Sequence, residues 1–410
     1  MPSVIFAAPQ LSENASRMVE AAVSLPDVRL GVITHDPVER LEPPLRSKIA
    51  AHWRVENVLD KAQLVDAARS LSSKLGPIHR FFGAYEQLQV PLAEAREELG
   101  IAGMRKEAVN NFRDKSRMKD VFRAHDIPCA RHKLVTNEME AISFASEVGY
   151  PLVVKPPAGA GAQSTFRVEG DDELRNAVRA GAPQAGRPLL LEEFITGDEH
   201  SFETISINGN PVWHSLTHYR PTPLDVLRNP WIQWCVVLPR EVDAPAYDDI
   251  RIAARRAIQV LGMDTGLTHM EWFRRRDGSI AISEVAARPP GAQITSLMSV
   301  AHGIDMVKAW ARVMIFGEFE PPERRYSVGV AFLRGQGGGE GGGRVKAIHG
   351  LDLIQREMGA LVVDAKLPTI GQSPAAGYEG EGWVILRHPE TEVVEKALLR
   401  LISVVRVELG

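Results

Sequence analysis

The chain changes character near residue 151, and this change limits the folds that are open to it. From there on, apolar segments of strand length are separated by turn residues, and they occupy residues 151–155, 165–168, 189–194, 200–207, 211–217, 267–274 and 279–285. Asn208-Gly209 and Asp277-Gly278 are typical of tight turns between paired strands. The middle of the chain is therefore predicted to contain hairpin-connected strands.

The first 35 residues predict a different arrangement. Residues 4–8 are apolar, residues 13–23 have a helical mixture of small and polar side chains, and residues 28–34 are apolar and β-branched. Strand, helix and strand in this order indicate a parallel α/β unit. A dinucleotide-binding fold would carry a glycine-rich loop after the first strand, but Ala8-Pro9-Gln10 stands there. We expect the same winding without that cofactor loop.

Several longer segments predict helices. Residues 113–126 place Met118, Val121 and Phe122 on one face, and Ile127-Pro128 ends the helix because proline disfavours helix in the residue before it. Residues 248–261, 304–316 and 392–404 predict three more. Together with the strands, these helices place the chain in the α/β class.

Bulk properties exclude several kinds of protein. A net charge of −4 over 410 residues gives no electrostatic footprint for nucleic acid. Cys129 and Cys235 lie far apart, which argues against a disulfide framework or a cysteine zinc site. No apolar run approaches the roughly 18 residues needed to span a bilayer. We expect a cytoplasmic protein of two to four structural units, without nucleic-acid or membrane partners.

A candidate phosphate-binding segment surrounds Lys155. An apolar strand delivers this lysine, and small residues follow from Gly159 to Ser164. Small residues allow backbone N–H groups to approach a phosphate closely, and the lysine adds a point charge. The Walker pattern is absent, so a P-loop fold is not indicated. Taken alone, a surface hairpin with a solvated lysine explains the segment equally well.

Carboxylates gather at two further places. Glu192 and Glu193 end an apolar strand, and Glu199 follows a glycine turn, although a solvated acidic turn explains this segment better on its own. Strand alternation puts His269 and Glu271 on one face, and a hairpin would bring Glu271 beside Glu284. Two carboxylates ~4 Å apart repel by roughly 4 kcal/mol at an effective dielectric of 20, a cost that Mg²⁺ would remove. Unrelated surface glutamates remain the alternative.

In their order and spacing, these segments resemble the ATP-grasp superfamily, in particular its carboxylate–amine ligases that act on amino acids. The resemblance covers about residues 80–320. Arg113-Asp114-Lys115 at the start of a helix is similar to the first lysine motif of the family. Lys155 with its loop is similar to the second, and Arg288 is similar to an arginine that holds the reacting acyl-phosphate.

The resemblance implies a role for each motif. It implies ATP as cosubstrate and Mg²⁺, or Mn²⁺ in its place, as the metal held by Glu271 and Glu284. The implied nucleotide contacts are Lys115, Lys155, Gly159, Gly161, Ser164, Glu192, Glu193, Ile195 and Glu199, and the implied catalytic residues are Arg288, Lys155 and Glu284. Ala286 stands where many relatives have an asparagine ligand, which puts a second Mg²⁺ in doubt.

The resemblance also implies a domain plan. A Rossmann-like domain would span residues 1–112, and an ATP-grasp domain would span residues 113–320 with lobes at 113–187 and 188–320. A small C-terminal domain, residues 321–410, would complete the ATP-grasp fold. A homodimer is expected from family analogy alone.

The expected substrates are a small-molecule carboxylate and an amine. Residues that we expect to line their pocket are Trp213, His214, His218, Arg220, His269 and Arg288. The favoured reaction is formation of an amide through an acyl-phosphate, with release of ADP. Two alternatives stay open, namely a carboxylase-like or purine-pathway enzyme that activates bicarbonate or formate, and an ATP-binding module without catalysis.

Overall fold

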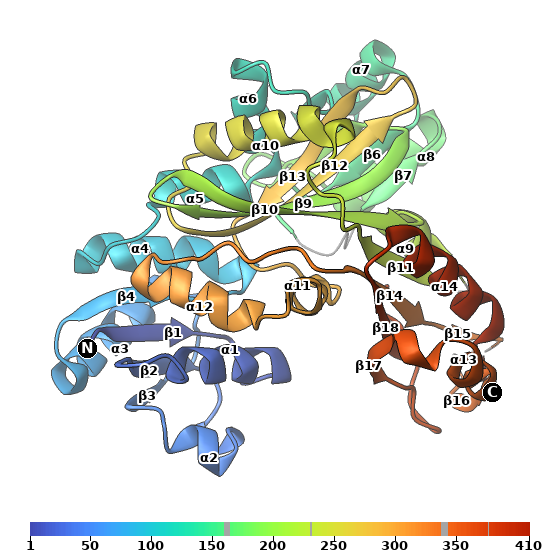
Figure 1. Cartoon of the computed structure of the whole chain (residues 1–410). Coiled ribbons are helices and arrows are strands. Elements are labelled where there is room, and N and C mark those ends of the chain that lie inside the picture. The colour runs from blue at the N-terminus through green and yellow to red at the C-terminus, as the bar shows by residue number, and fades with distance from the viewer. Residues whose placement is uncertain (160–164, 230–231, 338–342, 376) are drawn as a thin grey trace.

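A computed structural model describes residues 1–159, 165–229, 232–337, 343–375 and 377–410. Within these ranges the strands form one parallel sheet, one large antiparallel sheet and two smaller sheets, with helices packed against them (Figure 1). The predicted α/β class is confirmed. No helix in the described ranges has both the length and the apolar character that a membrane crossing requires.

The N-terminal part forms the parallel sheet, with strand order β3-β2-β1-β4. The predicted strand–helix–strand unit corresponds to β1 (Ser3–Ala7), α1 (Glu13–Val23) and β2 (Arg29–Thr34). Helix α1 begins where it does because the Ser12 hydroxyl accepts a hydrogen bond from the Ala15 N–H at 3.2 Å. The other elements of this part are α2 (Pro43–Arg46), β3 (Ala51–Arg54), α3 (Lys61–Leu75), β4 (Ile78–Phe82) and α4 (Gln89–Leu99).

The predicted helix over residues 113–126 is two helices in the structure. Helix α5 (Lys106–Arg113) ends at Asp114, and α6 (Lys115–Ala124) begins directly after it. The Asp114 carboxylate accepts hydrogen bonds from the N–H groups of Ser116 and Arg117 at 2.9 and 3.0 Å, which makes Asp114 the N-cap of α6. Lys115 therefore stands in the first turn of a helix.

A small antiparallel sheet follows, with strand order β5-β8-β6-β7. Its strands are β5 (His132–Val135), β6 (Leu152–Lys155), β7 (Phe166–Val168) and β8 (Leu189–Glu193), and its helices are α7 (Glu138–Val148) and α8 (Asp171–Gly181). Apolar residues of both helices pack on the sheet, including Phe144 and Leu174. Pairing of β6 with β8 sets Lys155 near the strand that carries Glu192.

The large sheet is antiparallel, with strand order β13-β12-β9-β10-β11-β14-β18-β17. Its strands are β9 (Gly197–Ile207), β10 (Asn210–Arg220), β11 (Trp234–Leu238), β12 (Gly266–Arg275), β13 (Ile280–Ala286), β14 (Ser327–Leu333), β17 (Val362–Lys366) and β18 (Gly382–His388). Asn208 and Gly209 both have positive φ, which is the conformation that a two-residue hairpin turn between β9 and β10 requires.

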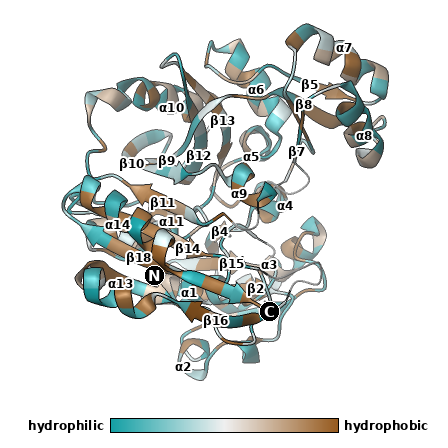
Figure 2. Cartoon of the chain, turned by 90° about the vertical axis from the view of Figure 1, so that its right-hand side faces the viewer, coloured by the Kyte–Doolittle hydropathy of each residue, from teal (hydrophilic) through white to brown (hydrophobic). Residues whose placement is uncertain are grey.

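Strands from the C-terminal part therefore continue the sheet that β9 to β13 begin. The remaining elements are α9 (Pro223–Arg228), α10 (Asp248–Val260), α11 (Ile294–His302), α12 (Met306–Phe316), β15 (Gly335–Gln336), β16 (Val345–His349), α13 (Leu351–Met358), α14 (Thr391–Val404) and β19 (Arg406–Leu409). In Figure 2, α13 shows both hydrophilic and hydrophobic residues, as expected of a helix with one buried face.

Helix α12 joins the N-terminal sheet to the rest of the molecule, and Figure 1 shows it lying between them. Phe6 packs edge-on against Phe82, and Phe82 packs in the same way against Trp310 of α12, with ring centroids 5.7 Å apart in both pairs. These residues belong to one hydrophobic cluster that also contains Val236 and Val330 of the large sheet. The N-terminal part and the large sheet thus share a core.

Candidate active site

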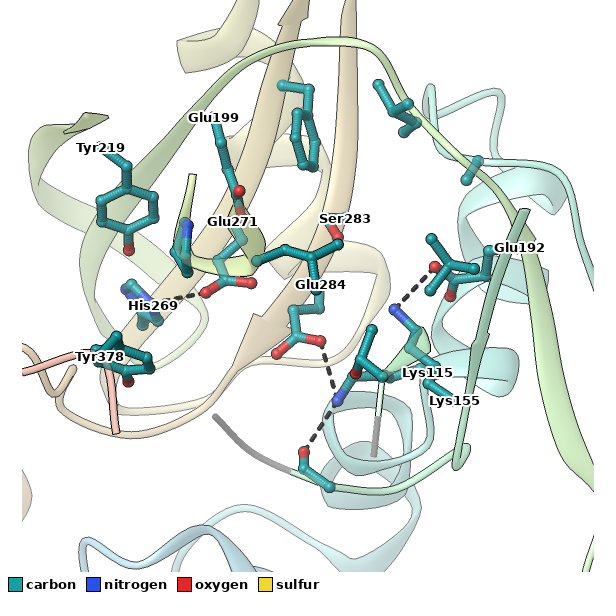
Figure 3. A pocket seen from close by; sticks show the side chains of 18 of the residues that line it. Lys115, Lys155, Glu192, Glu199, Tyr219, His269, Glu271, Ser283, Glu284 and Tyr378 are labelled. Atoms are coloured by element: carbon teal, nitrogen blue, oxygen red, sulfur yellow. Dashed lines mark hydrogen bonds and ion pairs between the residues drawn. The ribbon is translucent and has the colours of Figure 1, made fainter. Parts of the chain in front are cut away.

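A cavity of about 1380 Å³, including its open mouth, lies between the small sheet and the large sheet. Most of the residues predicted for the site line it, and Figure 3 shows ten lining residues by name. The predicted residues in its wall are Lys115, Lys155, Gly159, Glu192, Glu193, Ile195, Glu199, His269, Glu271, Glu284 and Arg288. Gly161 and Ser164 lie outside the described residues.

The two predicted metal ligands are direct cross-strand partners. Strands β12 and β13 pair so that Glu271 stands opposite Glu284, and an irregularity in the register follows immediately. The Glu284 carboxylate forms an ion pair with the Lys115 ammonium at 2.9 Å. Burial alone would raise the pKa of Glu284, but Lys115 and Lys155 outweigh it and hold the pKa at about 2. Glu284 is therefore ionised at neutral pH.

Lys115 connects the start of α6 to the loop after β6. Its ammonium donates to the Gly159 carbonyl at 3.0 Å, and its backbone N–H donates to the Pro157 carbonyl at 2.9 Å. Burial lowers the pKa of Lys115, but Glu284, Glu86 and Glu271 together outweigh it, so the pKa is raised. A fully charged ammonium thus stands between the carboxylates and the loop predicted to bind phosphate.

Glu192 lies between two lysines. Lys119 and Lys155 each approach its carboxylate to 2.8 Å, and Lys119 also donates to the Ser283 carbonyl at 2.6 Å. Burial would raise the pKa of Glu192, but the two ammonium groups bring it down to about 2. The Glu192 carboxylate, which the sequence predicts to contact adenosine, is therefore ion-paired with two lysines. Sequence reasoning missed Lys119, although it lies one helical turn after Lys115 on the same face of α6.

A third carboxylate faces the pair on β12 and β13. Burial, and then the charges of Glu271 and Glu284, raise the pKa of Glu199 well above its ordinary value. This crowding of like charges fits a bound cation, which would relieve it. Among the residues that the structure describes, no group of three or more His, Cys, Asp or Glu side chains is arranged to hold a metal by itself. Oxygen atoms of a bound ligand would have to complete the coordination shell.

Behind Glu271 lies a buried chain of polar groups. His269 Nδ1 is 2.9 Å from a carboxylate oxygen of Glu203, and His269 Nε2 is 3.8 Å from Glu271. Glu203 has no exposed surface, and it accepts hydrogen bonds from the hydroxyls of Ser201 and Thr217. Burial lowers the pKa of His269, but Glu203 and Glu271 raise it to about 9. His269 is a cation at neutral pH.

Arg288 reaches the site from the residues after β13. Its Nε and Nη2 atoms lie 2.9 and 2.8 Å from one carboxylate oxygen of Glu86, and Arg113 pairs with the other oxygen. Glu86 belongs to the N-terminal part and is buried. Sequence reasoning missed Glu86, and no local pattern marked it.

Apolar residues flank the strand edge predicted to bind adenine. Ala130, Ile195 and Ala281 form a small buried cluster, and Phe273 packs against it. The Glu193 N–H already donates to the Arg131 carbonyl at 2.9 Å. The Glu193 carboxylate also accepts hydrogen bonds from Arg131. The edge at residues 193–195 thus borders an apolar cluster.

Four predicted substrate residues lie away from the cavity. Trp213 packs in the core against His302 with ring centroids 5.3 Å apart, and His214 stacks on Phe202. The other two, His218 and Arg220, contact Tyr247 and Glu395 at 3.1 and 2.7 Å. Tyr219 lines the cavity instead, because alternation along β10 turns its neighbours to the opposite face.

Comparison with known families agrees with this geometry. A model of the ATP-grasp domain matches residues 120–299, which include Lys155, Glu192, Glu271, Glu284 and Arg288. Within residues 120–299, this chain carries an ATP-grasp domain. Lys115 lies just before the matched segment, at the start of α6.

The proteins that resemble this chain in sequence are only distantly related to it. An L-arginine-specific L-amino acid ligase of Bacillus subtilis is 24% identical over 280 residues, covering 67% of this chain and 66% of that protein. The chain spans only 52% of the length of an alanine–anticapsin ligase from the same species.

Solved structures show the same fold over the whole chain. An L-amino acid ligase from Bacillus licheniformis has a TM-score of 0.77 at 19% identity, covering 100% of this chain and 99% of that one. N5-carboxyaminoimidazole ribonucleotide synthetase from Thermotoga maritima has a TM-score of 0.69 at 17% identity, covering 100% of both chains.

Proposed function

We propose that this protein is an ATP-dependent carboxylate–amine ligase that forms an amide bond, with amino acids as substrates and ADP as product. The observation that carries the proposal is the pairing of Glu271 with Glu284 across two strands, in one cavity with Lys115 and Lys155. The relatives named as amino acid ligases support the substrate class.

The nucleotide would lie along the wall from residue 193 to Lys155. Adenine would sit against the apolar cluster at Ile195, with the backbone at Glu193 and Ile195 as its hydrogen-bonding edge, and Glu199 would accept from the ribose. Lys115 and Lys155 would bind the phosphates. Glu271 and Glu284 would hold Mg²⁺, which neutralises phosphate oxygens when bound.

Phosphoryl transfer depends mainly on positioning and on neutralising charge. The carboxylate substrate would attack the γ-phosphorus of ATP, forming a carbon–oxygen–phosphorus link as the bond to ADP breaks. The amine would then attack the carbonyl carbon, and inorganic phosphate would leave. Arg288, fixed by Glu86, would hold the negatively charged acyl-phosphate between the two steps.

A second candidate is an enzyme that activates bicarbonate or formate. Two observations favour it: the purine-pathway synthetase from Thermotoga maritima has the same fold over its full length, and Ala286 replaces the asparagine of many ligases. The two candidates differ in which compound stimulates ATP hydrolysis. Bicarbonate or formate would do so in one case and an amino acid in the other.

The decisive assay measures ADP and phosphate release with amino acids in pairs, with bicarbonate and with formate, and detects the product by mass. Glu284→Gln should lower turnover by about 100-fold or more while leaving part of the nucleotide binding, because a ligand of the metal is lost. The exposed Glu147, changed to Gln, is the matched control and should have no effect. Normal turnover in Glu284→Gln would refute the metal assignment, and nucleotide binding without any turnover would favour a non-catalytic module.

A further inference from the structure

The cavity has a second end that the nucleotide would not fill. In Figure 3, Tyr219, Tyr378 and His269 lie beyond Glu271, on the side away from Glu192 and Lys155. Leu224 and Ile294 also line the cavity. Two tyrosine rings thus line this end of the cavity, next to His269.

The aromatic wall is rigid because each ring is held by another group. The Trp234 indole N–H donates to the Pro221 carbonyl at 3.0 Å, and its ring stacks on Phe332 with centroids 5.0 Å apart. Tyr378 meets Trp234 edge-on at 4.8 Å, and Tyr219 lies 5.7 Å from it. A preformed apolar surface binds a ligand with little loss of conformational entropy.

The C-terminal part supplies one side of this wall. Tyr378 precedes Glu379, whose carboxylate accepts a hydrogen bond from the Ala292 N–H at 3.2 Å. Ala292 follows Arg288 by four residues and has a positive φ. The contact therefore fixes Tyr378 relative to the loop that carries the proposed acyl-phosphate residue.

No free positive charge is offered to a ligand here. In the described part of the chain, each cation that lines the cavity is already engaged: the proposed function assigns Lys115 and Lys155 to the phosphates and Arg288 to the acyl-phosphate, and His269 pairs with Glu203. An acidic side chain would lose its hydration without gaining an ion pair, which is costly. A basic side chain would compete for the carboxylates that the metal and the ribose need.

We propose that this end of the cavity binds an amino-acid substrate whose side chain is apolar or aromatic, and that Tyr378 determines this specificity. The proposal rests on the proposed ligase function. It follows from the two tyrosine rings in the wall, from the engagement of the lining cations by other groups and from the anchoring of Tyr378 through Glu379.

The test compares kcat/KM for ATP-dependent phosphate release across leucine, methionine, phenylalanine, glutamate, aspartate, lysine and arginine. We expect the apolar and aromatic amino acids to exceed the charged ones at least ten-fold. Tyr378→Ala should reduce kcat/KM for them about ten-fold, mainly through KM, while ATP binding changes less than two-fold. Tyr326→Ala, which removes a tyrosine outside the cavity, should leave the specificity profile unchanged.

A second variant covers the case in which Tyr378→Ala fails to fold. Leu224→Arg adds a cation to the wall of the cavity and should raise the relative kcat/KM for glutamate and aspartate about ten-fold. If charged amino acids are the best substrates of the unchanged protein, the inference is wrong and the ligase function stands. If only bicarbonate or formate supports phosphate release, the ligase function itself is wrong, and the inference falls with it.

Discussion

Replacing Lys119 by methionine tests whether the buried ion pairs of the small sheet stabilise this fold. Lys119 has no exposed surface, and its ammonium contacts both Glu192 and the Ser283 carbonyl, which belong to different sheets. Methionine has nearly the same length and shape, so the change removes the charge and leaves little empty space. One carboxylate oxygen and one carbonyl would lose their partner.

The magnitude follows from the pKa of Glu192. Lys119 and Lys155 hold that pKa at about 2, against an ordinary value of 4.5. At about 1.36 kcal/mol per pKa unit, the difference corresponds to about 3 kcal/mol of stabilisation of the ionised form. Removal of one partner from a buried ion pair costs about 3 to 5 kcal/mol in other proteins. We predict a loss of about 3 kcal/mol at pH 7.

Urea unfolding at pH 7, followed by tryptophan fluorescence and by circular dichroism, measures this loss. Agreement of the two signals is needed, since a chain with several structural units does not always unfold in one step. The matched control is Lys133→Met, which removes an exposed lysine from β5 and should change stability by less than about 0.5 kcal/mol.

The double variant Lys119→Met/Glu192→Gln separates the ion pair from general damage to packing. The glutamine at position 192 carries no charge, so the loss of the Lys119 ammonium leaves no unpaired buried carboxylate. The double variant should therefore be more stable than the sum of the two single changes predicts. The reasoning is refuted if Lys119→Met costs less than about 1 kcal/mol, or if the two changes are additive.

Two further predictions concern stability alone. Burial lowers the pKa of His200 to about 4 and that of His218 to about 3, so the folded state keeps them neutral while the unfolded state takes up protons below about pH 6.5. The melting temperature should therefore fall as the pH drops from 6.5 towards 3, and the double variant His200→Gln/His218→Gln should show a weaker fall. If the double variant has the same pH profile as the unchanged protein, the prediction is wrong. Gly197→Ala would place a Cβ against the backbone of Arg274 and should cost about 2 kcal/mol or more, whereas Gly159→Ala meets nothing within 4 Å and should be neutral by thermal unfolding.

The sequence was most informative where a contact is local. The hairpin of β12 and β13 joins residues only 13 positions apart, so strand alternation and one turn were enough to predict that Glu271 and Glu284 face each other. The same reasoning correctly predicted the turn at Asn208-Gly209.

Errors arose where local patterns compete. Helix periodicity over residues 113–126 ignored the capping ability of Asp114, which ends one helix and starts the next. The pocket residues on β10 were chosen as a group, although neighbours on a strand point to opposite faces. Alternation separates Tyr219 at the cavity from His218 and Arg220 on the other face.

Glu86 shows why part of the site could not be found from the sequence. It pairs with Arg288, 202 residues away, and the two come together only because α12 fixes the N-terminal sheet against the rest of the molecule. Without Glu86, the guanidinium groups of Arg288 and Arg113 would face each other with no carboxylate between them, which is unfavourable in a partly buried position. The N-terminal part thus contributes a charge to the site as well as a surface to the core, and the orientation of Arg288 depends on how the two parts pack.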